Sequence, residues 1–320
     1  MKKKVAISIG DLNGIGIQLA LENHTAISQW IDPLYCIDQA MLQQAAKKLN
    51  LSIPDHFQTI APIAPAFDIL PGIVSRESGA YAYASFVKAV ELAREKRVDA
   101  VCTLPIHKKA WELAGIKYKG HTDALRDFFN AEAIMMLGCP QMYVALFTEH
   151  IPLRDVAGSI NTRDLTRFFV DFYHTAHPKS TVAVLGLNPH AGDDGVLGNE
   201  ETIIQKAIDQ ASDRLKKEIP SLSTIHYPLF TSPLVPDVAF TPHMRKHYTH
   251  YIAMYHDQGL APLKALYFDE GINVSLNLPI LRTSVDHGTA FDIAYKEVQL
   301  NRLSYLNAMR YITENLDKSV

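Results

Sequence analysis

Three histidines each follow a short apolar run of the kind that forms a buried β-strand. The runs and their histidines are 142–147 with His150, 181–187 with His190, and 251–254 with His256. Ligands of open α/β sheets bind beyond the carboxyl ends of strands, so three strands could deliver these imidazoles to one point. Three neutral imidazoles hold a divalent metal and leave a coordination position open, as catalytic sites do. Spacing alone leaves a second interpretation, because any of the 14 histidines also fits a hydrogen-bonded loop residue.

The surroundings of the three histidines favour the metal site. Each lies in a polar, turn-rich segment, and Asp257 or Glu149 could orient an imidazole ring from outside the coordination sphere. Imidazole ligands favour zinc, with magnesium and cobalt as alternatives. The chain has no HExxH pattern, which excludes the helix of a zinc protease.

A second group of residues suits an anionic substrate. Lys264, Asn273 and Arg282 lie in an otherwise apolar region, and charges in such surroundings usually have a partner. The partner is either an internal carboxylate such as Asp269 or a phosphate and carboxylate on a substrate. The guanidinium of Arg282 and the two hydroxyls that follow it suit a phosphate.

Two turns could bind an anion with backbone amides. In the segment 120–123, Thr122 is predicted as a helix N-cap, either a plain cap or one that receives an anion. The segment 286–290 is predicted as a polar turn that opens a helix and binds a nucleotide phosphate. The glycine-rich segment 10–16 follows the first strand, yet it has neither the GxGxxG spacing nor a Walker lysine.

The elements that must position these residues alternate between strands and helices. Apolar runs at 5–9, 34–37 and 99–103 predict strands, and stripes of helical period occur at 86–93, 165–172 and 305–312. This order is typical of an α/β protein with parallel sheets covered by helices. The length of 320 residues indicates two domains, with weakly marked boundaries.

Composition excludes several classes of protein. The 31 Lys and Arg residues balance 34 Asp and Glu residues, so we expect no nucleic acid partner. The most apolar stretch, 133–147, is interrupted by polar residues, glycine and proline, so we expect no membrane segment. We expect no targeting segment at the start of the chain. Three widely spaced cysteines in apolar context predict reduced, buried thiols and a cytoplasmic protein.

Five segments together carry a resemblance that covers nearly the whole chain. They are 105–108, 120–122, 187–192, 254–259 and 282–290. In order and spacing they resemble the 4-hydroxythreonine-4-phosphate dehydrogenases of vitamin B6 biosynthesis. The resemblance implies an isocitrate/isopropylmalate dehydrogenase-like fold of two α/β/α domains with an active-site cleft between them. It also implies a homodimer with the active site at the subunit interface. We expect one domain at 1–125 plus 256–320, with the cofactor and phosphate elements, and a second at 126–255, with metal ligands and dimer contacts.

The resemblance also implies roles for individual residues. It makes His150, His190 and His256 the ligands of one divalent metal, with His256 contributed by the other subunit. Substrate contacts would come from His121, Thr122, Lys264, Asn273 and Arg282. Catalytic roles would fall to His121, Asp237 and Lys264, with the general base left open between the first two. Asp286, His287, Gly288 and Thr289 would bind NAD or NADP.

The implied reaction is oxidative decarboxylation of 4-phosphooxy-L-threonine to 3-amino-2-oxopropyl phosphate and carbon dioxide. One alternative is a paralogue that oxidises another four-carbon phosphorylated acid, such as a threonate or erythronate phosphate. A metal-dependent hydrolase and a metabolite-binding protein without activity are further alternatives. Two features depart from the pattern. In the first turn, Leu12-Asn13 and Ile17-Gln18 replace the Pro-Ala and Pro-Glu pairs common in the family, and Tyr295 replaces a glycine of the isopropylmalate enzymes.

Overall fold

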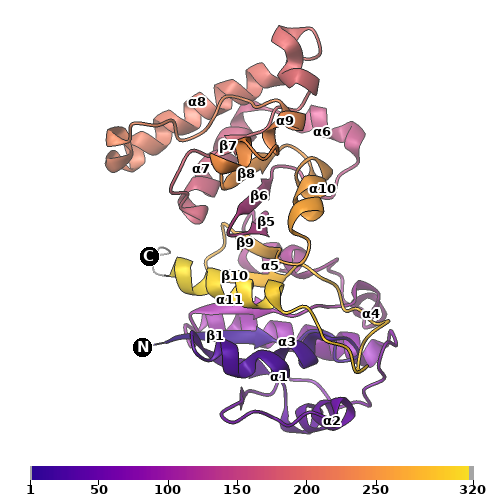
Figure 1. The fold of residues 1–320 in the computed structure, drawn as a ribbon. Helices are drawn as coiled ribbons and strands as arrows, with labels where there is room; N and C mark the ends of the chain where they lie inside the picture. Colours follow the sequence, from indigo (N-terminus) through magenta and orange to yellow (C-terminus); the bar gives the residue numbers. More distant parts are fainter. Residues whose placement is uncertain (1, 317–320) are drawn as a thin grey trace. The chain divides into compact units, whose positions relative to one another are not determined.

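The computed structural model describes residues 2–316, which divide into two compact units. Unit 1 comprises residues 1–133 and 269–320, and unit 2 comprises residues 134–268. The sequence-based expectation places the inserted unit at 126–255. Each unit is a β-sheet covered by helices, as the alternating sequence pattern predicts (Figure 1).

Unit 1 is built on a largely parallel sheet. Its strands are β1 (Lys3–Ser8), β2 (Ile31–Cys36), β3 (Gln58–Thr59), β4 (Ala100–Thr103), β9 (Ile272–Leu276) and β10 (Leu281–Val285). Their order is β3-β2-β1-β4-β10-β9, and only β9 runs antiparallel to its neighbour β10. Its helices are α1 (Gly16–Ile27), α2 (Gln39–Leu49), α3 (Arg76–Arg94), α4 (Lys108–Leu113), α5 (His121–Phe129) and α11 (Leu303–Asn315).

Side chains that alternate along the strands of unit 1 bury both faces of the sheet. On one face, Ala6, Leu34 and Val101 pack against Ala89 and Leu92 of α3. On the other face α11 lies along β10, as Figure 1 shows, and the Thr283 hydroxyl contacts the Ala308 carbonyl oxygen at 3.5 Å. The sheet is therefore covered on both sides, as parallel sheets are.

Unit 2 has a smaller mixed sheet of order β5-β6-β8-β7. Its strands are β5 (Ile134–Cys139), β6 (Met142–Leu146), β7 (Ala183–Val184) and β8 (His250–Ala253). The β5–β6 pair is antiparallel, whereas β6–β8 and β7–β8 are parallel. Its helices are α6 (Leu153–Ser159), α7 (Thr162–Ala176), α8 (Glu200–Glu218), α9 (Pro236–Ala239) and α10 (His256–Tyr267), with 3-10 segments η1 (Pro189–Gly195), η2 (Pro220–Thr224) and η3 (Met244–Lys246).

Helices α10 and α7 contribute to the packing of unit 2. Leu260 and Leu263 of α10 join Val144 and Tyr251 of the sheet in the core cluster.

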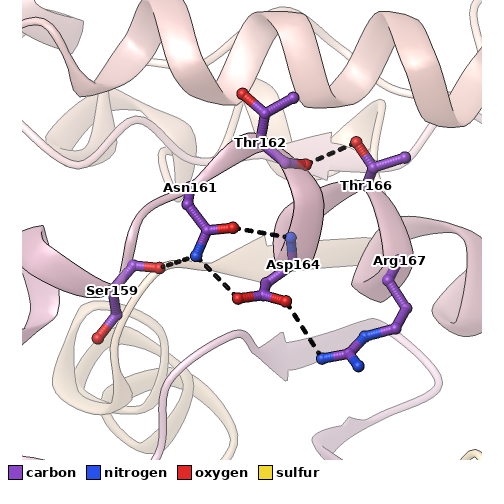
Figure 2. Close-up of polar contacts among 6 residues, drawn as sticks. All are labelled: Ser159, Asn161, Thr162, Asp164, Thr166 and Arg167. Atoms are coloured by element: carbon purple, nitrogen blue, oxygen red, sulfur yellow. Dashed lines mark hydrogen bonds and ion pairs between the residues drawn. The ribbon is translucent and has the colours of Figure 1, made fainter.

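The start of α7 is defined by a polar network, drawn in Figure 2, in which Asn161 Oδ1 accepts the Asp164 backbone N–H at 2.9 Å. An N-cap of this kind satisfies an amide that has no partner within the helix.

Several sequence-based expectations need correction. The run 181–187 forms only the two-residue β7, flanked by single bridges from Val182 to Phe230 and from Leu185 to Leu234. Pro233 lies between those two bridge partners and cannot donate to a ladder, which explains the short strand. The antiparallel strands β5 and β9 break the expected parallel pattern.

Two turns also differ from prediction. The N-cap of α5 is Gly120, and Thr122 is the second residue inside the helix. At this helix start the Asp123 carboxylate accepts the Lys119 backbone N–H at 3.0 Å. No helix follows the turn 286–290, and α11 begins only at Leu303. The backbone of this turn makes a tertiary hydrogen bond in place of helical ones: the Thr289 carbonyl oxygen accepts the Ile15 backbone N–H at 3.1 Å.

Other expectations are confirmed. Cys36, Cys102 and Cys139 are free and buried. Within residues 2–316, the helices are too short or too polar to cross a bilayer.

Candidate active site

His150 and His256 lie next to each other in unit 2. Strands β6 and β8 are parallel, with Leu146 opposite Ala253, so the two strands end at the same edge of the sheet. His150 follows β6 by four residues, and His256 begins α10. Their ring centroids are 5.5 Å apart with the planes at 43°. The structure thus brings two of the three predicted histidines together beyond the ends of neighbouring strands.

The geometry of the pair fits a shared divalent ion. Two imidazoles on a tetrahedral zinc, with Zn–N near 2 Å, have centroids about 5 Å apart. The Asp257 carboxylate contacts His256 Nδ1 at 2.6 Å, the orienting contact predicted from the sequence. This contact leaves Nε2 of His256 available to a metal ion, as in carboxylate–histidine–metal arrangements.

His190 and Asp237 line a cavity of about 380 Å³ in unit 2. The other lining residues are Leu187, Pro189, Pro236, Tyr255 and Gln258. The cavity therefore adjoins the start of α10, where His256 lies. Within residues 2–316, however, no three side chains of His, Cys, Asp or Glu form a group that could hold an ion. One chain thus pairs His150 with His256 and does not complete the predicted trio.

Arg282 forms the centre of the candidate anion site in unit 1. It lies on β10 and is 2% exposed. Its Nη1 donates to Ser275 Oγ at 3.1 Å and its Nη2 to Thr103 Oγ1 at 2.5 Å, while its buried Nε has no partner among residues 2–316. Burial lowers the pKa of Arg282 to about 10, so the guanidinium stays charged at neutral pH. The internal carboxylate considered from the sequence does not pair with it in the described part of the chain.

His121 is the second buried polar group of this site. Its ring packs against Phe86 and Trp111, with centroids 4.8 and 5.4 Å away, and its Nε2 has no hydrogen-bond partner among the described residues. Burial, reinforced by the positive charge of Arg282, lowers the pKa of His121 well below 6.5. The ring is therefore neutral and can exchange a hydrogen bond with a ligand.

The remaining predicted substrate residues divide between the units. Asn273 lies opposite Ser284, so its side chain shares a sheet face with those of Ser275 and Arg282. Its Oδ1 is buried without a partner. Thr122 is 9% exposed beside His121 on α5. Lys264 belongs to unit 2, on α10, where its Nζ lies 5.7 Å from the centroid of the Phe268 ring.

The predicted cofactor turn keeps free amides despite its lack of a helix. Throughout residues 2–316, the backbone N–H groups of His287, Gly288 and Thr289 have no acceptor. The Asp286 amide donates to Ser304 Oγ at 3.1 Å. His287 Nε2 is buried and unpaired, and burial lowers the pKa of this imidazole. The turn can therefore still offer donors to an anion.

The departures from the family pattern belong to one hydrogen-bonded region. Tyr295 donates its hydroxyl to the Leu12 carbonyl oxygen at 2.7 Å. Asn13 Nδ2 donates to the Ile73 carbonyl oxygen at 2.7 Å, and Asn13 Oδ1 accepts the Leu70 amide at 2.8 Å. Tyr295 thus ties the first turn to the segment after the cofactor turn, and Asn13 ties the same turn to residues 70–73, so both have structural roles.

Sequence reasoning missed three polar groups. Asp11 is fully buried, and burial raises the pKa of its carboxyl to about 6, although Asn13 N and Ser78 Oγ donate to it. His107 Nδ1 is buried without a partner, and its ring stacks on Phe291. Gln258 lines the cavity. Its place between His256 and Gly259, in a segment that carries the resemblance, was the available signal.

Fold and site together define an α/β protein that has an imidazole-lined cavity in one unit and a buried cationic anion site in the other. Comparison with known proteins is more specific. Residues 29–312 match the family described as pyridoxal phosphate biosynthetic protein PdxA, and the chain belongs to this family.

Individual relatives agree with this assignment. The chain is 57% identical over 309 residues to a 4-hydroxythreonine-4-phosphate dehydrogenase of Sulfurimonas denitrificans, covering 97% of this chain and 96% of the relative. Among solved structures, the enzyme of that name from Burkholderia phymatum has a TM-score of 0.76 at 31% identity, covering 99% and 98% of the two chains. The one from Klebsiella pneumoniae has a TM-score of 0.77 at 28% identity, with the same coverage. The predicted family and fold class are confirmed.

Proposed function

We propose that this chain is a 4-hydroxythreonine-4-phosphate dehydrogenase that depends on NAD(P) and a divalent metal. It oxidises C3 of 4-phosphooxy-L-threonine, transfers the hydride to NAD(P)⁺ and releases the hydroxyl proton. The β-keto acid then loses carbon dioxide, takes up a proton and becomes 3-amino-2-oxopropyl phosphate. The observation that carries the proposal is Arg282, a buried guanidinium with an unpaired Nε beside a neutral imidazole.

The anion site supplies the recognition of the substrate. Nη1 and Nη2 of Arg282 donate to hydroxyl groups of the protein, and its Nε–H is available to donate to an anionic oxygen. Asn273 adds a polar atom on the same sheet face as Arg282, and Thr122 and Lys264 are further candidates for contacts with the substrate. Because Arg282 is already desolvated, a bound anion gains a charge-assisted hydrogen bond without a further desolvation cost on the protein side.

His150, His190 and His256 would hold the metal ion. Imidazole donors favour zinc, with magnesium and cobalt as alternatives. When bound, the ion would act as a Lewis acid toward the oxygen on C3 of the substrate and would stabilise negative charge that develops there. Asp257 keeps the His256 ring oriented for ligation through Nε2.

Asp286, His287, Gly288 and Thr289 would bind the cofactor, which is NAD or NADP. The nicotinamide would supply the hydride acceptor for the oxidation of C3. The unpaired amides of residues 287–289 can donate to a cofactor phosphate. The segment presents these amides as an irregular turn, so the contribution of a helix dipole is missing.

His121, Asp237 and Lys264 are the candidates for proton transfer. The pKa of His121 is low in the empty site because of burial and Arg282. A phosphate or carboxylate bound at Arg282 would offset that positive charge and raise the pKa of the imidazole. His121 therefore becomes a stronger base when substrate is present, whereas Asp237 borders the cavity that His190 lines.

A homodimer would complete the site: because no three candidate ligands gather within the described residues of one chain, at least one of the three histidines would come from the other subunit. Support comes from apolar side chains that stay exposed directly after the histidine segments. Leu153 is 69% exposed and follows His150, and Val196 is 78% exposed and follows the His190 segment. Exposed apolar residues of this kind mark interaction surfaces when they cluster. The reduced, buried cysteines support a cytoplasmic location.

The decisive experiment uses the purified protein with a panel of phosphorylated hydroxy acids. We expect absorbance of reduced nicotinamide to appear with 4-phosphooxy-L-threonine and to disappear after chelation. Preference for a threonate or erythronate phosphate would indicate a paralogue. Phosphate release without nicotinamide reduction would indicate a metal-dependent hydrolase, and binding without turnover would refute an enzymatic function.

A further inference from the structure

The segment that carries His190 has an unusual backbone. Five consecutive residues, 190–194, have positive φ angles between 46° and 83°, and Gly192 is the only glycine among them. Residues with a Cβ adopt the left-handed conformation singly, and rarely in a run, because Cβ approaches the following carbonyl oxygen. Such a conformation persists only when surrounding contacts impose it.

The carboxylate of Glu201 accepts three of these contacts. Glu201 Oε1 accepts the backbone N–H groups of Leu187 at 2.8 Å and Asn188 at 2.7 Å. Its Oε2 accepts Asn188 Nδ2 at 2.9 Å, and the same Nδ2 also donates to Glu200 Oε2 at 2.7 Å, whereas both backbone amides donate to Glu201. All three donors belong to the two residues that lead into η1. Within the described residues no lysine, arginine or histidine pairs with Glu201, so this carboxylate serves the segment alone.

Two glycines leave the space that the carboxylate occupies. A Cβ on Gly186 would lie 3.1 Å from Glu201 Oε1, and a Cβ on Gly192 would lie 2.6 Å from Glu201 Oε2. Glu201 is thus enclosed by the backbone before the segment and by the left-handed backbone within it. The same residue is absent from the lining of the cavity that His190 borders.

We propose that Glu201 is the positioning residue of the His190 segment. Its acceptor-only carboxylate holds residues 187 and 188, and the left-handed turn that follows then presents His190 to the cavity. The inference rests on the proposed function in one respect, which is that His190 ligates the metal. A glutamine at position 201 would replace one acceptor oxygen with an NH2 donor that faces N–H donors. At least one of these donors would then lose its acceptor.

The test compares Glu201→Gln with Asp213→Asn, a change of an exposed carboxylate on the same helix. Hydrogen exchange reports the segment without reference to activity. We expect the amides of Leu187 and Asn188 to exchange about tenfold faster in Glu201→Gln and at the original rate in Asp213→Asn. Unchanged exchange in Glu201→Gln would overturn the proposal.

Metal affinity gives the second readout. We expect the dissociation constant of Co²⁺, titrated by its visible absorption, to rise about 10-fold to 100-fold in Glu201→Gln. Turnover at saturating metal should recover to within about threefold of the original protein, because Glu201 touches neither substrate nor ion. Loss of turnover that saturating metal does not restore would overturn a positioning role.

A second variant covers the case in which Glu201→Gln does not fold. Gly192→Ala keeps the carboxylate and displaces it, so exchange should accelerate and Co²⁺ should bind more weakly. If the original protein binds no Co²⁺ at all, the metal site of the proposed function fails. The exchange rates then still decide whether Glu201 holds the segment.

Discussion

The two units prepare their functional residues in opposite ways. In unit 1, Arg282 and Asn273 lie on strands, with polar atoms buried and unpaired. In unit 2, His150 and His190 are exposed on segments that follow strands. The candidate anion site is thus preorganised and has already incurred the cost of desolvation, whereas the proposed metal site would depend on a turn, an ion and a second subunit. Changes in unit 1 should therefore alter substrate affinity and stability, and changes in unit 2 should alter metal content and assembly.

The largest effect should come from His190→Ala. Loss of a ligand should remove the bound metal and lower kcat/KM by about 1,000-fold or more. Metal analysis and absorbance of reduced nicotinamide measure the two losses. His174→Ala is the control, since His174 contacts Glu218 on the exposed side of α7. Full turnover without bound metal in His190→Ala would contradict the metal site.

Mixed dimers sharpen the same comparison. We expect co-expressed His190→Ala and His256→Ala subunits to regain about half the activity per dimer, because one of two shared sites then has all its ligands. Separately, each variant should be inactive. Mixed dimers without any recovery would indicate that a single chain supplies both ligands.

Arg282→Lys should have the next largest effect. A lysine cannot reproduce the planar fork, so the KM for the phosphorylated substrate should rise about 100-fold. Arg282→Met removes an unpaired buried charge and should raise the free energy of unfolding by about 1–3 kcal/mol while abolishing turnover. Steady-state kinetics and denaturant titration measure these effects. A lower free energy of unfolding for Arg282→Met would contradict the idea that the buried charge of Arg282 destabilises the protein.

Asp11→Asn tests the stability of unit 1 alone. Folding raises the pKa of this carboxyl from 3.8 to about 6, so the folded state favours the protonated form. The free energy of unfolding is therefore highest below pH 3.8, where the carboxyl is protonated in both states, and it falls as the pH rises through 6. An asparagine avoids that loss, which amounts to about 3 kcal/mol. The melting temperature of the variant should exceed that of the original protein at pH 7.5 and equal it near pH 4. The same difference at both pH values would contradict this pKa.

The smallest effect should come from Val196→Asp. A charge on this exposed apolar residue should weaken the dimer about tenfold and lower metal content in proportion. Sedimentation equilibrium measures the dissociation constant. Ile63→Asp is the control, because Ile63 is 92% exposed in unit 1. Equal dissociation constants for the two variants would place the dimer contact elsewhere.

Much of the fold follows from local patterns. The stripes at 86–93, 165–172 and 305–312 lie in α3, α7 and α11, because a period of 3.6 residues is a local property. The strand at 181–187 was overestimated, since its length depends on the distant segment 230–234. The helix expected after residue 286 was wrong because the backbone of Thr289 bonds to Ile15, far away in sequence.

The sequence alone determined which residues could do chemistry and to which family they belong, since residue types and their order survive without any coordinates. Only the tertiary structure decided that His150 meets His256, that Arg282 lies buried without a carboxylate, and that Glu201 lies beneath the turn of His190. The physical reason is range. Helix periods and caps depend on neighbours a few positions away, whereas strand register and burial depend on contacts between residues far apart in the chain, which no local pattern specifies.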